Sequence, residues 1–588
     1  MADLGLIAES PIDRLRAALA TQGSAAMLLP EADEHLSEYL APHSRRLAWA
    51  TGFTGSQGLL LLLPDRAFLL VDGRYTLQAQ GEVFAGIEVR ATPANTIAAL
   101  LDEAGFVGDV GYDPWLHSID AIARLSAQLA PACALKPLAG NPVDALWSDR
   151  PPAAPTRAWV QPLALAGQSS SDKRQQVGAA AQAAGAAGVL LTHLDSIAWT
   201  LNIRGGDLPF TPVVRAFLLV AGEGSATLHV DAAKLDDEVR DHLGAAVAIR
   251  PYEAFSAELP GLAGPLLVDP ESTADAIRAL ASCPLISAPD PTVAMRAHKS
   301  AAEIAGARAA HLRDGVVLAR FLRWLEGAAP WSHLDEIDAA QRIEALRQEQ
   351  PDYLGPSFAP ISAFGANAAL PHYLPHPGRA ARLHEGALYL LDSGGQYAGG
   401  TTDVTRTVAL GEPDAAMRTH FTLALKGHLA IAARRFPPGT TGGDLDPLAR
   451  QYLWEAGLDY ATGTGHGLGS CLSVHEGPVF IGRRGGTRSV DAPLFPGLIL
   501  TVEPGFYLAG RYGVRTENAY LIIEDGEGWL GFEPLTLAPI DRRLIDLDLL
   551  TPHERDWLDR YHAAVAEAVG PHLAVPERAW LAAACAPL

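Results

Sequence analysis

Four carboxylates and one histidine in the last third of the chain could bind metal ions together. Each stands at the end of an apolar, strand-like run or in a glycine-rich segment. Oxygen-rich ligation with one nitrogen suits Mn²⁺, Mg²⁺ or Fe²⁺ better than a structural zinc. Four negative charges favour two ions, which at ~3.5–4 Å from each other would generate hydroxide near neutral pH. The residues are Asp392, Asp403, His466, Glu503 and Glu517.

Asp392 and Asp403 are predicted to meet across a pair of strands. Asp392 ends the apolar run 387–391, and the run 401–408 carries Asp403, with four glycines between them. An antiparallel pairing through this loop would bring the two carboxylates close on one face. Two carboxylates forced together repel each other unless a cation lies between them or one is protonated.

Glycines surround His466 at alternate positions in the segment 463–469. Their missing side chains allow the backbone to approach closely whatever His466 binds. The segment does not satisfy G-x-G-x-x-G, so a dinucleotide-binding loop is disfavoured. A second histidine, His475, follows nine residues later beside a Gly-Pro turn.

Arg515 and Glu517 stand two apart in the predicted strand 512–523, so their side chains should share a face. An arginine beside a buried glutamate would hold that glutamate ionised. Taken singly, each candidate has an ordinary interpretation as a turn residue, a satisfied polar side chain or a sheet-face ion pair. The combination favours a metal site, since the H-E-x-x-H, G-x-S-x-G and P-loop motifs are all absent from the sequence.

The elements that must position these residues divide the chain into three predicted parts, 1–147, 148–295 and 296–588. Pro-rich connectors at 149–155 and 284–291 suggest the boundaries. At ~150 residues per domain, a chain of this length accommodates three. The first two parts read as mixed α/β units, and the third as a long helix followed by short strands. The predicted elements are helix 12–19, strands 58–63 and 67–71, helix 171–187, strand 189–192, hairpin 217–230, helix 301–327 and helix 551–569.

Composition excludes several other classes. Of 588 residues, 48% are apolar and 19% charged, which is typical of a globular protein. The net charge of −22 argues against a broad basic face for nucleic acid. Four widely spaced cysteines match neither a zinc knuckle nor a disulfide framework, and neither an N-terminal apolar segment nor a run of ~18 apolar residues is present. We therefore expect a cytoplasmic protein without nucleic-acid or membrane partners.

These motifs resemble those of the pita-bread metallopeptidases. More closely, the chain is similar to the three-domain, cytosolic-type aminopeptidase P family, whose members remove an N-terminal residue that precedes proline. The resemblance covers almost the whole chain, and its most specific motifs lie in the third part. The matching segments are 392–407, 463–467, 474–478, 503–505, 515–518, 356–358, 367–373, 52–56 and 72–75.

The resemblance implies an α/β (α+β) architecture, with two creatinase-like N-terminal domains followed by a pita-bread catalytic domain. It also implies two divalent metal ions, usually Mn²⁺. Asp392 would ligate one ion in bidentate fashion, and Asp403 and Glu517 would bridge both. His466 and Glu503 would complete the second ion.

The same resemblance implies how a peptide with proline at its second position is cleaved. A hydroxide that bridges the metals would attack the carbonyl carbon before proline, and Glu503 would relay the proton to the proline nitrogen. His372 and His475 would steady the substrate and the tetrahedral intermediate. Arg515 would hold the bridging-carboxylate region in place. The family also implies a homodimer.

One position departs from the family. Four residues before His466, where a histidine usually contributes to substrate contacts, this chain has Thr462. A hydroxyl is shorter than an imidazole and cannot become cationic. We expect metal binding to survive this change, and peptide affinity, length preference and pH optimum to differ.

Two other functions stay open at this point. The first is a prolidase-like Xaa-Pro dipeptidase of the same superfamily, although two full N-terminal parts exceed what a dipeptidase usually carries. The second is a peptidase-dead, peptide-binding module on the same scaffold. Such a module should lack metal ligands, whereas all five are present here.

Overall fold

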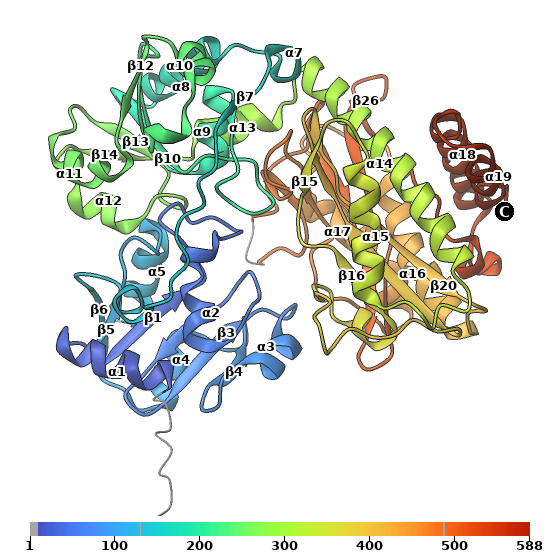
Figure 1. The fold of residues 1–588 in the computed structure, drawn as a ribbon, viewed down its shortest axis with the longest axis horizontal. Coiled ribbons are helices and arrows are strands. Elements are labelled where there is room, and N and C mark those ends of the chain that lie inside the picture. The colour runs from blue at the N-terminus through green and yellow to red at the C-terminus, as the bar shows by residue number, and fades with distance from the viewer. Residues whose placement is uncertain (1–9, 130, 486–488) are drawn as a thin grey trace, which may run out of the picture. The chain divides into compact units, whose positions relative to one another are not determined.

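The computed structural model describes residues 10–129, 131–485 and 489–588 (Figure 1). The chain forms two compact units. Unit 1 comprises Met1–Val160, Ser170–Pro209 and Val213–Thr292, and unit 2 comprises Gln161–Ser169, Phe210–Pro212 and Val293–Leu588. Residues 1–9, for which we expect no targeting segment, lie outside the described residues.

Unit 1 contains two six-stranded sheets. The first has the order β4-β3-β2-β1-β5-β6, in which β1 pairs antiparallel with β2 and parallel with β5. The predicted strands 58–63 and 67–71 are confirmed as the antiparallel pair β2 and β3. The elements are α1 (Pro11–Thr21), β1 (Ala26–Pro30), α2 (Arg46–Thr51), β2 (Leu59–Leu62), β3 (Ala67–Val71), α3 (Thr76–Glu82), β4 (Glu88–Ala91), α4 (Ile97–Glu103), β5 (Gly108–Tyr112), α5 (Ile119–Leu129), β6 (Cys133–Pro137) and α6 (Pro142–Leu146).

Helix α1 shows why the pattern at the start of the chain predicts a helix. The Ser10 side chain accepts a hydrogen bond from Asp13 N, and a proline occupies the first turn. Ile12, Leu15 and Leu19 are buried, as their spacing predicts. The helix therefore packs one apolar face into the core of the first sheet.

The second sheet of unit 1 has the order β12-β11-β10-β8-β13-β14. The predicted hairpin is confirmed as β10 and β11. Two expectations are wrong in detail. The helix expected at 171–187 ends at Ala183, because Gly185 adopts a left-handed φ of 81°. The elements are β7 (Trp159–Val160), α8 (Ser170–Ala183), β8 (Gly188–Leu191), α9 (Leu194–Leu201), β9 (Ile203–Arg204), β10 (Ala216–Ala221), β11 (Ala226–Val230), α10 (Asp237–Leu243), β12 (Val247–Arg250), α11 (Phe255–Glu258), β13 (Leu266–Val268), α12 (Asp275–Leu280) and β14 (Leu285–Ser287).

The second correction concerns the connector expected at 284–291. It contains strand β14, which pairs parallel with β13. Three residues between flanking prolines give too short a pattern to predict a strand. The strand forms because its backbone pairs with β13, a contact that the local sequence does not show. Helix α13 (Pro291–Ala297) then leads toward unit 2.

Unit 2 holds the predicted site residues. Its two main sheets have the orders β16-β17-β20 and β22-β21-β23-β26-β27, and β15-β18-β19 and β24-β25 form smaller ones. The elements are α7 (Leu163–Ala166), α14 (Ala301–Gly327), α15 (Glu336–Gln348), β15 (Tyr353–Pro356), β16 (Ile361–Phe364), β17 (Ala387–Ser393), β18 (Gly395–Tyr397), β19 (Gly400–Thr401), β20 (Val404–Leu410), α16 (Ala415–Ala432), α17 (Gly442–Glu455), β21 (Gly465–Gly467), β22 (Glu476–Ile481), β23 (Ile499–Val502), β24 (Gly505–Leu508), β25 (Tyr512–Arg515), β26 (Asn518–Glu524), β27 (Leu530–Pro534), α18 (Pro552–Val569) and α19 (Val575–Ala584).

The long helix α14 anchors the core of unit 2. A capping box formed by Ser300 and Glu303 starts it at the predicted residue. It packs against α15, as Figure 1 shows, and its buried residues Val317 and Phe321 join an apolar cluster with Tyr389 of β17. This packing fixes the sheet that carries Asp392.

The strand expected at 512–523 is split into two. Arg515, the last residue of β25, pairs with Gly505 of β24, whereas Asn518, the first of β26, pairs with Val502 of β23. The chain thus changes sheets at residues 516–517. Glu517 stands in this crossover, and its backbone N–H donates a hydrogen bond to Thr405 O at 3.2 Å.

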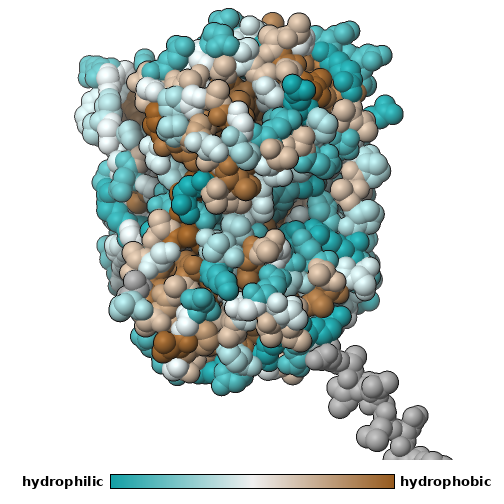
Figure 2. Space-filling view, turned by 90° about the vertical axis from the view of Figure 1, so that its left-hand side faces the viewer, coloured by the Kyte–Doolittle hydropathy of each residue, from teal (hydrophilic) through white to brown (hydrophobic). Residues whose placement is uncertain are grey.

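The described residues contain no helix with the length and apolarity needed to cross a membrane. On the face drawn in Figure 2, hydrophobic residues form separate groups among hydrophilic ones.

Candidate metal centre

Three of the five predicted ligands meet at one buried point. Ligand atoms of Asp403, His466 and Glu517 all lie within 4.8 Å of one another. His466 Nε2 is 3.4 Å from Asp403 Oδ2 and 3.5 Å from Glu503 Oε1, so Glu503 adjoins the same point. His466 is the middle residue of β21, whereas Asp403, Glu503 and Glu517 lie just outside strands of unit 2.

Asp392 joins this group through the strand pairing that the sequence predicts. Strands β17 and β20 are antiparallel, and Asp392 lies opposite Thr405, two residues beyond Asp403. Asp403 itself lies just before β20 rather than inside a strand. Asp392 Oδ2 accepts a hydrogen bond from Arg515 Nη2 at 2.5 Å. Its other oxygen, Oδ1, is buried without a hydrogen-bond partner among the described residues.

The electrostatics of the cluster fit a cation. Burial, reinforced by the charge of Asp403, raises the pKa of Asp392 to about 6. Burial also raises the pKa of Glu503 to about 7, and that of Glu517 well above its usual range. These carboxylates therefore resist ionisation together unless positive charge lies among them. A divalent ion would supply that charge and a partner for Asp392 Oδ1.

The backbone of the next residue orients the ring of His466. Its Nδ1 lies 3.0 Å from Gly467 O, which leaves Nε2 facing the carboxylates. Burial disfavours its charged form, but the hydrogen bond with Asp403 and the charge of Glu503 outweigh burial and raise its pKa. The flanking glycines are required, because a Cβ at Gly465 would lie 2.1 Å from Thr501 O.

The charge of Arg515 lowers the pKa of Glu517, as expected, but burial and the charges of Asp403, Glu503 and Asp392 outweigh it. The arginine donates to Asp392, and its Nε donates to Thr405 Oγ1 at 3.0 Å. Glu517 Oε2 instead accepts a hydrogen bond from Thr405 Oγ1 at 2.7 Å, and its pKa stays raised. Arg515 alone therefore does not keep Glu517 ionised. Thr405, which the sequence argument missed, links the arginine to the glutamate.

Arg406 is a second residue that sequence reasoning missed. Its guanidinium is buried and donates to Glu517 O at 2.7 Å and to Asn518 Oδ1 at 2.8 Å. It also donates to Ala538 O at 2.8 Å and to Tyr561 OH at 2.9 Å. It thereby fixes the crossover that carries Glu517. Only its place in the run Asp-Val-Thr-Arg-Thr pointed to it.

A buried ion pair braces both aspartate segments from the other side. Arg347 Nε donates to Asp314 Oδ1 at 2.8 Å, and Arg347 Nη2 donates to Ser393 Oγ at 3.1 Å. Thr402 Oγ1 donates to Asp314 Oδ2 at 3.0 Å. Ser393 and Thr402 are the chain neighbours of Asp392 and Asp403. The pair comes from α14 and α15, and no motif in the sequence indicated it.

The two further histidines occupy different positions. The ring of His475 lies against that of His466, with centroids 4.4 Å apart and an interplanar angle of 86°. His372 is half-buried, and the carbonyl of the preceding Pro371 accepts from Arg515 Nη2 at 3.4 Å. His475 therefore directly adjoins a predicted ligand, and His372 is tied to the site through Arg515.

Thr462 is half-buried, and its carbonyl accepts a hydrogen bond from Arg450 Nη2 at 3.1 Å. Its Oγ1 is buried and has no hydrogen-bond partner among the described residues. No hydrogen bond of this hydroxyl within the described residues explains why a threonine stands at position 462.

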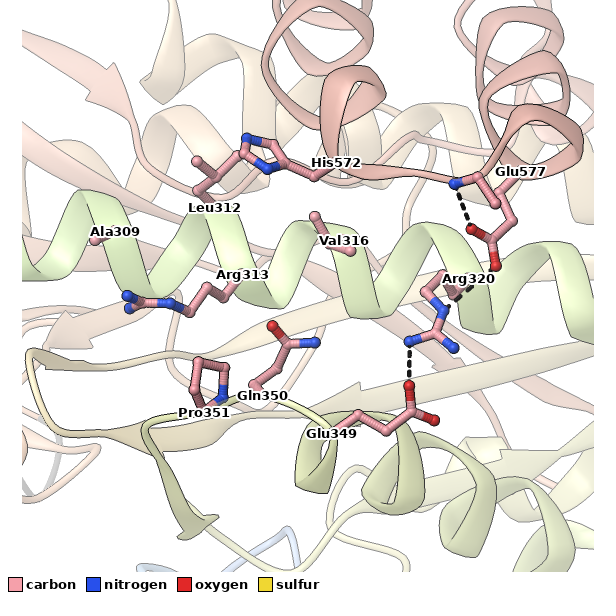
Figure 3. A pocket seen from close by; sticks show the side chains of 11 residues that line it. Ala309, Leu312, Arg313, Val316, Arg320, Glu349, Gln350, Pro351, His572 and Glu577 are labelled. Carbon is pink, nitrogen blue, oxygen red and sulfur yellow. Dashed lines mark hydrogen bonds and ion pairs between the residues drawn. The ribbon is translucent and has the colours of Figure 1, made fainter.

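A groove of about 710 Å³ lies elsewhere in unit 2, between α14, the end of α15 and the start of α19 (Figure 3). None of the predicted site residues lines it. Arg320 in this groove pairs with Glu349 at 2.6 Å and with Glu577 at 3.3 Å. Arg320 is therefore paired with carboxylates on two sides of this groove.

Comparison with known proteins agrees with this geometry. Residues 11–146 and 149–303 match creatinase/prolidase N-terminal domains, 305–524 match metallopeptidase family M24, and 528–588 match the C-terminal region of peptidase M24. A probable Xaa-Pro aminopeptidase P from Fusarium vanettenii is 38% identical over 591 residues, covering 95% of each chain. Another from Neurospora crassa is 38% identical, covering 91% of this chain and 82% of the relative.

A solved structure is similar along the whole chain. It is an X-prolyl aminopeptidase from Caenorhabditis elegans, described as a cytosolic enzyme with a di-nuclear active site. The TM-score is 0.90 at 35% identity, covering 98% of this chain and 99% of that one. A prolidase from Thermococcus sibiricus, at 24% identity and a TM-score of 0.51 over 63% of this chain, shares the fold.

Proposed function

The chain belongs to metallopeptidase family M24, and from that premise we propose how its residues perform the reaction of the family's Xaa-Pro aminopeptidases. It is a metal-dependent aminopeptidase that hydrolyses the bond between an N-terminal residue and a following proline. One observation supports the assignment to this site above all. Asp403, His466 and Glu517 converge within 4.8 Å, buried beside Glu503.

We propose that this cluster holds two divalent ions. Asp392 is assigned to one ion, because its Oδ1 is buried and lacks a partner among the described residues. Asp403 and Glu517 are assigned to both ions, and His466 and Glu503 to the second. The hard oxygens that dominate this set favour Mn²⁺. When bound, two such ions activate a water and polarise the scissile carbonyl.

The side chains around the ions then position the peptide and transfer a proton from the attacking water. Glu503 accepts the proton of the attacking water at its carboxylate and passes it to the leaving proline nitrogen. His475, whose ring adjoins that of His466, and His372 hold the substrate carbonyl and the tetrahedral intermediate. Arg515 keeps Asp392 in place through its 2.5 Å hydrogen bond.

Specificity for proline follows from the tertiary amide. An Xaa-Pro bond has no N–H, so a site shaped around the pyrrolidine ring rejects ordinary peptide bonds sterically. The substrates are peptides with proline at the second position. A prolidase-like activity would instead be confined to Xaa-Pro dipeptides.

A panel of short peptides tests the proposal. Purified protein is assayed on X-Pro-Y, X-Pro and X-Ala-Y peptides, after chelation and after addition of Mn²⁺ or Zn²⁺. We expect hydrolysis of X-Pro-Y that disappears on chelation and returns with Mn²⁺ in preference to Zn²⁺. Comparable rates on X-Ala-Y, or full activity in protein shown to contain no metal, would contradict the assignment. Metal binding without turnover would favour a peptide-binding module.

We also propose that the enzyme acts in the cytoplasm as a homodimer of three-domain chains with boundaries at 147/148 and 295/296. The description of the C. elegans structure as cytosolic supports the compartment. The family-model limits at 146/149 and 303/305 lie near the proposed boundaries. Analytical ultracentrifugation would test the dimer, which rests on family resemblance.

A further inference from the structure

A buried ion cluster lies beside His475 in the chain and has no part in the proposed reaction. Lys299 Nζ donates a hydrogen bond to Glu476 Oε1, and Arg296 Nε lies 3.5 Å from Glu476 Oε2. The side chains of Arg296, Lys299 and Glu476 are 5%, 1% and 3% exposed. Two cations thus face one carboxylate inside unit 2. These three residues are called the Glu476 clamp below.

The cationic side of the clamp is fixed to two parts of the backbone. Lys299 stands between α13 and α14, and its Nζ also donates to Arg296 O at 2.9 Å. Its backbone N–H donates to Gly497 O at 3.2 Å, just before strand β23, which ends at the residue preceding Glu503. The lysine is therefore fixed both to the end of α13 and to the segment that leads into β23.

The anionic side of the clamp sets the contact between two site histidines. Glu476 begins β22 and pairs with Gly467, the residue after His466. The approach is close enough that a Cβ on Gly467 would lie 2.2 Å from Glu476 O. His475 directly precedes Glu476 in the chain, and the centroid of its ring lies 4.4 Å from that of the His466 ring. A shift of Glu476 would therefore move His475 relative to His466.

We propose that the Glu476 clamp is a positioning device for His475. Arg296 and Lys299 hold the Glu476 carboxylate, and this fixes the imidazole of His475 at the distance from the metal centre that the reaction requires. Removing one partner of a buried ion pair leaves an uncompensated charge, which the structure relieves by moving. The inference rests on the proposed role of His475 in binding substrate and intermediate.

Two clamp variants of the full-length, Mn²⁺-loaded enzyme test this. Glu476→Gln keeps the shape of the side chain, and Lys299→Met keeps most of its apolar stem. We expect each to lower kcat on X-Pro-Y peptides by roughly ten- to a hundredfold, since small displacements at a reacting centre cost rates of this order. The metal content should be unchanged, and kcat/KM should fall at least as far as kcat, because His475 is assigned to both the substrate and the intermediate.

The chain offers a matched control. Lys426 of α16 and Glu554 of α18 form another buried lysine–glutamate pair, with Nζ–Oε distances of 2.7 and 2.8 Å and side chains 9% and 11% exposed. Lys426→Met should lower the melting temperature and leave kcat unchanged at a temperature where it is folded. Should Lys299→Met fail to fold, Glu476→Gln carries the comparison. A kcat for Glu476→Gln equal to that of Lys426→Met would overturn the clamp.

A double-mutant cycle with His475→Ala decides whether the clamp acts through that histidine. In the His475→Ala background, Glu476→Gln should have almost no further effect on kcat, because the group that it positions is gone. Additive losses would show an independent structural role and overturn the inference. An unchanged kcat in His475→Ala alone would refute both the clamp and the proposed role of His475. If that variant still hydrolyses X-Pro-Y peptides, the proposed aminopeptidase activity would remain supported although the role of His475 is refuted.

Discussion

The two oxygens of Asp392 have different environments. Oδ2 accepts from Arg515, whereas Oδ1 is buried without a partner among the described residues. A buried carboxylate oxygen left without a hydrogen bond costs free energy of about 1–3 kcal/mol or more. An enzyme tolerates such a position where a ligand completes it. At the scale of single residues, this oxygen identifies the side of the cluster that is open to a metal ion.

Asp403→Asn should abolish turnover while leaving a cooperatively folded protein. The substitution barely changes the volume but removes the charge assigned to both ions. Activity, bound metal and thermal unfolding are measured on the same preparation. Asp207→Asn is the matched control, because Asp207 is a buried aspartate of unit 1 that accepts from Lys234 at 2.6 Å. Near-normal turnover in Asp403→Asn would show that Asp403 is not a bridging ligand.

Thr462→His should lower KM for tripeptides and longer peptides without changing kcat. The native hydroxyl has no hydrogen-bond partner among the described residues, so its replacement breaks no contact there. An imidazole reaches further and adds binding that is equal in ground state and transition state. Steady-state kinetics on X-Pro-Y peptides of increasing length measure the effect. Identical KM values for both proteins across the series would show that this position does not contribute to peptide binding.

At the scale of elements, the site depends on the crossover between β25 and β26. Arg406 holds this crossover through Glu517 O and Asn518 Oδ1. Arg406→Met should lower the free energy of unfolding by roughly 3 kcal/mol, because several buried acceptors lose a charged donor. It should also weaken Mn²⁺ binding, since Glu517 loses its support. Calorimetric titration with Mn²⁺ and denaturant unfolding measure the two effects.

Arg204→Met is the comparison for that experiment. Arg204 is a buried arginine of β9 in unit 1 whose Nη1 donates to Ala198 O at 3.1 Å and to Ile203 O at 3.0 Å. It should lower stability without weakening Mn²⁺ binding. Equal Mn²⁺ affinity in Arg406→Met and Arg204→Met would contradict a specific role for Arg406.

The sequence predicts an element well where the apolar pattern is long. It predicts an element less well where pairing with a distant strand determines the structure. Helix α14 and the pairing of β17 with β20 agree with prediction, because a capping box, a continuous apolar run and a short glycine-containing connection are all visible within a short stretch of sequence. The break at 516–517 is not predictable in this way, since it depends on Arg515 pairing with β24 and Asn518 with β23. For the same reason the contacts of Thr405, Arg406 and the Asp314–Arg347 pair are visible only in three dimensions.

At the scale of the whole molecule, the metals should contribute more to stability as pH rises. Burial raises the pKa of Asp392 to about 6 and that of Glu503 to about 7, so the metal-free fold binds protons more tightly than the unfolded chain does. Above the ordinary carboxyl pKa, the metal-free protein therefore loses stability as pH increases toward 8. Bound cations offset this loss.

The difference in melting temperature between Mn²⁺-loaded and chelated protein should accordingly grow from pH 6 to pH 8. Using the difference removes contributions from titratable groups outside the centre, which are the same in both forms. Scanning calorimetry at matched ionic strength measures it. A difference that shrinks with pH would contradict the charge balance described for the cluster.

The change of sheet at residues 516–517 has a topological consequence. Asp392 belongs to the sheet β16-β17-β20, whereas Glu503 and Glu517 adjoin strands of the sheet β22-β21-β23-β26-β27. Ions held by both groups would act as a cross-link, in the manner of a disulfide, between chain segments as distant in sequence as Asp392 and Glu517. Such a link restricts the unfolded chain by closing a long loop, and it joins the opening of the two sheets into one event.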